Sequence, residues 1–106
     1  MLLASNCSAR LNLDSLPILP GTLDVMEQGI TSSLHEGNRR SVDGVVLAPH
    51  RNFEVLFDPQ TAGGLLASVD AEVADGIVAD LRDAGYQDAV VIGEVFPRDE
   101  WLIDCR

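Results

Sequence analysis

The sequence predicts an α+β fold, a layered α/β/α domain whose sheet is mostly antiparallel. Apolar and polar residues alternate along residues 8–13, whereas apolar residues recur at helical spacing along residues 71–84. Elsewhere, short apolar runs lie between glycine, proline and aspartate residues, as strands do. The order strand, helix, loop, strand, strand, helix, strand is typical of a layered, partly ferredoxin-like domain. The length of 106 residues fits a single domain, residues 1–106.

The first third of the chain predicts a strand followed by a short helix. Residues 8–13 form the strand, and two prolines after it prevent it from continuing. Gly21 or Thr22 can cap a helix that runs to about Gln28, and Gly29 suits its C-terminal end.

The middle of the chain predicts a long loop and then two paired strands. Residues 31–52 are polar and rich in glycine and serine, so we expect a loop that holds at most a short turn of helix. Residues 53–57 and 65–69 are apolar runs that we expect to pair as antiparallel strands.

The last third predicts the longest helix and the closing strands. Residues 71–84 carry an apolar face, with Asp70 at the N-terminal cap and a glycine after the last residue. Residues 90–96 read as a buried strand, in which Gly93 indicates a bulge or a close backbone approach. Residues 101–103 add a short edge strand or pack back on the domain.

The charge of the chain argues against two classes of binding partner. Seventeen acidic residues against seven basic ones give a net charge of −10, which repels nucleic-acid backbones and anionic membrane surfaces. The acids are spread along the chain, as on a solubilising surface. We therefore expect neither a nucleic-acid nor a membrane partner.

The cysteines and histidines do not form a metal or redox motif. Cys7 and Cys105 lie near opposite ends, and His35 and His50 have no neighbouring ligand at zinc-site spacing. The sequence shows neither a signal peptide nor a membrane span, so a cytoplasmic, reduced protein is the simplest expectation.

The candidate functional segment is the loop that follows residues 53–57. Its polar and glycine residues could direct several backbone N–H groups toward one anion, or could simply connect two core strands tightly. The candidates are Asp58, Gln60, Thr61, Gly63 and Gly64.

Residues 58–66, Asp-Pro-Gln-Thr-Ala-Gly-Gly-Leu-Leu, closely resemble the D-P-Q-T-[SA]-G-G-L-L motif of the selenophosphate synthetases, or selenide, water dikinases. That motif belongs to the C-terminal domain of those enzymes, whose fold is shared with aminoimidazole ribonucleotide (AIR) synthetases. Further segments resemble the same family in the same order: residues 13–30, Ser33 with Asn38 and Arg39, and residues 89–95.

The resemblance implies an enzyme that makes selenophosphate from selenide and ATP and releases AMP and phosphate. ATP and magnesium would bind a separate N-terminal domain, which also carries a reactive cysteine or selenocysteine and a lysine. This chain contains no lysine, so we assign it no catalytic, cofactor-binding or metal-binding residue and expect it to be inactive alone. We expect the loop to form one wall of the interdomain cleft, and the surface left by the missing domain to favour a homo-oligomer.

Two alternatives remain at this point. Asn38 and Arg39 are weaker site candidates, because Arg39 could bind a phosphate or carboxylate or could be solvated. The chain could also be a stand-alone, noncatalytic module that keeps the fold for ligand binding or assembly.

Overall fold

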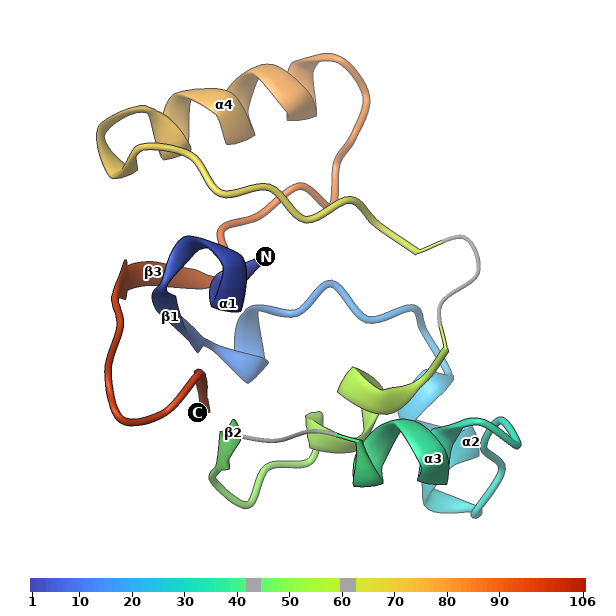
Figure 1. Cartoon of the computed structure of the whole chain (residues 1–106). Helices are drawn as coiled ribbons and strands as arrows, with labels where there is room; N and C mark the ends of the chain where they lie inside the picture. The colour runs from blue at the N-terminus through green and yellow to red at the C-terminus, as the bar shows by residue number, and fades with distance from the viewer. Residues whose placement is uncertain (42–44, 60–62) are drawn as a thin grey trace.

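A four-stranded sheet organises the chain (Figure 1). The computed structural model describes residues 1–41, 45–59 and 63–106. The strands are β1 (Cys7–Leu11), β2 (Val45–Leu47), β3 (Gly93–Pro97) and β4 (Ile103–Cys105), in the order β2-β4-β1-β3. β3 runs antiparallel to β1, whereas β4 is parallel to both β1 and β2. The α+β class is confirmed, but the mostly antiparallel, ferredoxin-like pairing predicted from the sequence is wrong for these strands.

The observed topology differs from the predicted one mainly in the position of β4. The sequence predicts residues 101–103 as an edge strand or a segment that packs back, yet β4 lies inside the sheet between β1 and β2. Asp104 indicates an exposed segment when the sequence is read alone, because an ionised carboxylate is rarely buried without a partner. Here Arg10 and Arg106 supply that partner, with Nε–Oδ2 distances of 3.0 and 2.7 Å.

The observed helices match the predicted ones best where capping residues mark the ends of the helix in the sequence. They are α1 (Leu2–Ser5), α2 (Thr22–Glu27), α3 (His35–Arg40) and α4 (Ala71–Asp83), with 3₁₀ helices η1 (Leu13–Ser15) and η2 (Phe53–Phe57). α2 and α4 confirm the two predicted helices. Asp70 occupies the N-cap position of α4 without a side-chain hydrogen bond to it, and Gly85 follows the helix with φ of 103°.

The predicted loop over residues 31–52 contains a short helix, α3, as the prediction allowed, but it also contains β2, so the prediction is wrong for this strand. β2 is only three residues long and gains its hydrogen bonds from β4, a partner far away in sequence. Such a strand leaves almost no local pattern. No helix among the described residues is long and apolar enough to cross a membrane.

Residues 53–57 form η2 and not the predicted strand. A run of five apolar-rich residues does not distinguish a strand from a helical turn. In η2 both Phe53 and Phe57 turn into the core, where their rings meet edge to face at 4.9 Å between centroids. Glu54 points away from the core toward α3.

The loss of that strand also removes the predicted partner of residues 65–69. These residues are exposed and are assigned to neither a helix nor a strand. The strand predicted over residues 90–96 is shorter and shifted to β3, and it is not buried, because Val95 is 48% exposed. β3 is an edge strand, so only one neighbour covers it.

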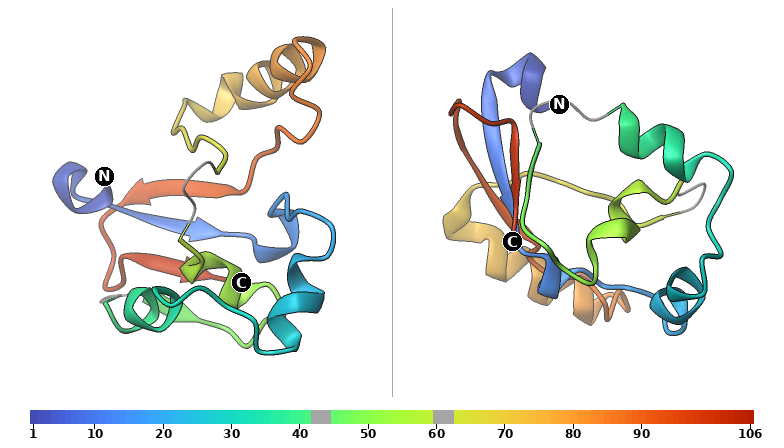
Figure 2. Two further views of the ribbon diagram at one scale, coloured as in Figure 1. Left: turned by 90° about the vertical axis from the view of Figure 1, so that its right-hand side faces the viewer. Right: turned by 90° about the horizontal axis from the view of Figure 1, so that it is seen from below.

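The core lies on the side of the sheet that η2 covers. Its buried members are Leu13, Phe53, Phe57 and Cys105, with Leu11, Leu16, Val45, Leu56 and Ile103 packed around them. Figure 2 shows α2 and α3 near the β4 and β2 side of the sheet, whereas α4 lies beyond the β3 edge. The core therefore fixes η2, and with it the start of the candidate loop.

Candidate functional site

The candidate loop begins at a point that α3 and η2 hold firmly. Asp58 follows η2 with φ of −66° and ψ of 128°, the extended conformation that a residue before proline adopts. The Nδ2 group of Asn38 on α3 donates a hydrogen bond of 2.9 Å to the carbonyl oxygen of Phe57. This bond ties the last residue of η2 to the neighbouring helix, so the loop starts from a fixed position.

Glu54 makes the second connection between the same two elements. One carboxylate oxygen lies 2.9 Å from His35 Nε2, and the other lies 3.3 Å from Arg39 Nε. His35 and Arg39 are four residues apart on α3 and therefore share one face of it. The His35 ring is 7% exposed and meets Phe57 edge to face, with 6.1 Å between ring centroids.

The contact with Glu54 also defines the chemistry of the His35 ring. When Nε2 carries the proton that bonds the carboxylate, Nδ1 is left as an acceptor. Nδ1 is buried and has no hydrogen-bond partner among the residues that the structure describes. Such a group is normally satisfied by a donor.

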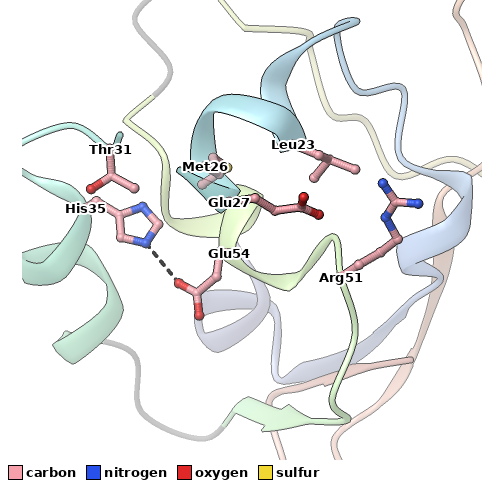
Figure 3. A pocket seen from close by; sticks show the side chains of 7 residues that line it. All are labelled: Leu23, Met26, Glu27, Thr31, His35, Arg51 and Glu54. Atoms are coloured by element: carbon pink, nitrogen blue, oxygen red, sulfur yellow. Dashed lines mark hydrogen bonds and ion pairs between the residues drawn. The ribbon is translucent and has the colours of Figure 1, made fainter. Parts of the chain in front are cut away.

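A pocket of about 200 Å³ opens beside this cluster (Figure 3). Its lining residues are Leu23, Met26, Glu27, Thr31, His35, Arg51 and Glu54. Figure 3 shows Glu54 and His35 meeting at one side of it and Arg51 reaching in from the other. Its walls combine an apolar patch from α2 with charges of both signs. Among the described ranges, no group of three histidine, cysteine or acidic residues could hold a metal ion.

The predicted site residues fall into three groups. Asp58 is half-buried at the start of the loop, and Gly63 and Gly64 are exposed. Gln60 and Thr61 lie outside the described residues. The backbone of Gly64 is not left-handed, and among the described residues no atom lies within 4 Å of a Cβ built on it. Neither strain nor crowding by the described residues therefore requires glycine at position 64.

The weaker candidates, Asn38 and Arg39, both contact η2. Asn38 donates a hydrogen bond to the carbonyl oxygen of Phe57, and Arg39 forms an ion pair with Glu54. Sequence reasoning did not identify His35 and Glu54 as a pair. The four-residue spacing of His35 and Arg39 could have indicated a shared acidic partner, but only after residues 35–40 were recognised as a helix.

The fold and the site define an α+β domain that presents an anchored, glycine-containing loop at its surface. The sequence profile of the family described as "AIR synthase related protein, C-terminal domain" matches residues 1–102. The chain belongs to this family.

Several similar curated proteins are named "Selenide, water dikinase". The protein of that name from Bdellovibrio bacteriovorus is 35% identical over 92% of this chain and 28% of its own length. Those from Clostridioides difficile and Pelobacter propionicus are 35% and 34% identical, over 94% and 90% of this chain and 30% and 28% of their own lengths. The resemblance read from residues 58–66 is thus confirmed. The chain spans less than a third of these relatives.

Proposed function

We propose that this chain is the C-terminal domain of a selenide, water dikinase, which makes selenophosphate from selenide and ATP and releases AMP and phosphate. Its loop of residues 58–64 forms one wall of the cleft that faces an N-terminal ATP-binding domain. ATP and magnesium bind that other domain, since this chain contains no lysine to pair with the phosphates.

The observation that carries this proposal is the environment of Gly64. A glycine is usually required by a left-handed backbone or by a close neighbour, and Gly64 has neither in the part of the chain that the structure describes. The remaining reason is space for something outside the chain, such as a phosphate group or the surface of the other domain. The exposure of Gly63 and Gly64 supports this reason, as does the similarity of the chain to selenide, water dikinases.

The anchoring contacts support a positioning role for the rest of the domain. Asn38 fixes the carbonyl group of Phe57, and Arg39 and His35 fix Glu54, so the loop leaves a rigid base. A rigid base is what a loop needs to approach a reacting group with accuracy. Both cysteines, Cys7 and Cys105, are free thiols, which suits a reducing, cytoplasmic location.

The experiment is a Gly64→Ala substitution in the full-length enzyme, with selenophosphate formation and melting temperature both measured. We expect turnover to fall at least about tenfold, because a small misplacement of reacting groups lowers the rate strongly. The melting temperature should stay unchanged. Gln60→Ala and Thr61→Ala should give smaller losses of the same kind. Gly37→Ala is the matched control, because Gly37 is also exposed with no atom near its Cβ position. Unchanged turnover for Gly64→Ala, or a loss that only follows unfolding, would show the loop to be a scaffold.

A further inference from the structure

The pocket beside α2 brings together two charges of opposite sign. Glu27 is the last residue of α2, and Arg51 lies just before η2. Both residues line the pocket, and Figure 3 shows the Glu27 carboxylate and the Arg51 guanidinium group facing each other across it. Neither side chain has a hydrogen bond or an ion pair with another residue in the described ranges. On an open surface both charges would be hydrated, so their meaning depends on what lies between them.

An apolar surface lies between the two charges. Leu23 and Met26 of α2 line the pocket and are half-buried. Leu23 is four residues before Glu27, so the leucine and the carboxylate share one face of the helix. Drug-sized ligands occupy pockets of about 300 Å³ or more, so a pocket of about 200 Å³ suits a smaller molecule. Such a molecule can bury an apolar group here while its two ends meet opposite charges.

His35 gives the same pocket a polar group that lacks a partner. The residue is 7% exposed and lines the pocket. Because Nε2 bonds the carboxylate of Glu54, Nδ1 is the acceptor of the neutral ring, and no described residue donates to it. A buried acceptor without a donor costs free energy, which a ligand that carries an N–H group can recover. Nδ1 is buried in the empty pocket, so we expect the ring to turn toward such a ligand when it binds.

We propose that this pocket binds an α-amino acid with an apolar side chain. The ligand carboxylate pairs with the planar guanidinium group of Arg51. The ligand ammonium group pairs with Glu27 and supplies the donor that His35 lacks, while the ligand side chain packs on Leu23 and Met26. A zwitterion has no net charge, so the chain's charge of −10 does not repel it. This inference concerns a different place from the loop and does not depend on the proposed function.

The test is an NMR titration of the ¹⁵N-labelled chain with L-leucine at physiological salt, which screens nonspecific attraction of cations. We expect saturable shifts of the amide signals of Leu23, Thr31 and Arg51, with a dissociation constant of about 1 mM or lower. 4-Methylpentanoate lacks the ammonium group and 3-methylbutylamine lacks the carboxylate, so each should bind at least about tenfold more weakly. Equal affinity for the three compounds, or leucine shifts that do not saturate, would overturn the proposal.

Two variants assign each end of the ligand to its residue. Glu27→Gln should weaken leucine binding at least about tenfold and leave 4-methylpentanoate binding unchanged. Arg51→Gln should weaken leucine binding as much and leave 3-methylbutylamine binding unchanged. Glu72→Gln and Arg98→Gln are the matched controls, because they remove the same charges from exposed positions outside the pocket. Leucine binding that the pocket variants leave intact, or that the controls weaken equally, would overturn the proposal. The comparison of the three compounds on the unmodified chain decides the matter even where a variant unfolds.

Discussion

The backbone of Gly93 in β3 lies directly against the carbonyl group of Arg10 in β1. A Cβ built on Gly93 would overlap the Arg10 carbonyl oxygen and would lie 3.1 Å from the Cα atom of Leu11. The close backbone approach that the sequence predicts at Gly93 is therefore confirmed. It occurs where the antiparallel pair begins, with Gly93 opposite Leu11.

A Gly93→Ala substitution should reduce the free energy of unfolding by about 1 to 3 kcal/mol, the usual range for overpacking. The neighbouring atoms belong to the backbone of β1, so they cannot move aside without disturbing the strand pairing. Urea unfolding followed by circular dichroism measures the change. Gly37→Ala should leave stability unchanged or slightly raised, since a Cβ there meets nothing. Equal stability of the Gly93 and Gly37 variants would contradict the close approach.

Asp104 should make stability dependent on pH in the acid range. Burial alone would raise the pKa of Asp104, but hydrogen bonds and positive charge from Arg10 and Arg106 hold that pKa below its ordinary value. A carboxyl whose folded-state pKa is lowered stabilises the protein at every pH above the ordinary carboxyl range. That contribution is lost as the pH falls through the lowered pKa.

We therefore expect Asp104→Asn to be less stable than the natural chain at neutral pH, with a difference that shrinks as the medium is acidified. Urea unfolding of both proteins at a series of pH values provides the measurement. A stability difference that stays constant with pH would show that the carboxylate charge is not what Arg10 and Arg106 stabilise.

The two cysteines should react at very different rates. Cys105 is 1% exposed, and burial together with the charge of Asp104 raises the pKa of its thiol. Only the thiolate is reactive, so Cys105 should react at least about a hundredfold more slowly than an exposed thiol. A colorimetric thiol titration should show one fast cysteine in the native chain and two in denaturant. Cys7→Ser should remove the fast phase, and a fast phase that persists would contradict the burial of Cys105.

The isolated chain should not bind Mg-ATP. It has no lysine and no P-loop motif to hold the phosphates, and its charge of −10 opposes any nucleotide. Calorimetric titration should therefore give only heats of dilution. Saturable binding in the micromolar range, about −8 kcal/mol, would point instead to a stand-alone nucleotide-binding module.

The sequence predicted the elements whose cause is local. The helix over residues 71–84 was recognisable from its apolar face, its acidic cap position and the glycine that follows it. In contrast, β2 and β4 are three residues long and exist because they pair with distant strands. The burial of Asp104 depends on Arg10, which no pattern near position 104 reveals.

In the candidate site, too, the features with a local cause could be predicted and those that depend on distant contacts could not. The motif around Gly63 and Gly64 could be recognised because its residues are contiguous. The meeting of His35 with Glu54 depends on the packing of α3 against η2, and η2 was expected to be a strand. A strand would have placed alternate side chains on opposite faces, so the wrong element concealed the pair.

The place of β4 inside the sheet has a consequence for how the chain folds. Arg10 and Asp104 are 94 positions apart, yet they hydrogen-bond within the pairing that joins β1 to β4. Contacts of such high sequence separation form slowly, because closing so long a loop costs chain entropy before the contact can stabilise it. During synthesis on a ribosome, β1 emerges long before β4. The side of β1 that pairs with β4 therefore stays unpaired until residue 105 has left the ribosome. The nascent chain is therefore most prone to aggregation in that interval, when the inner edge of β1 is still open.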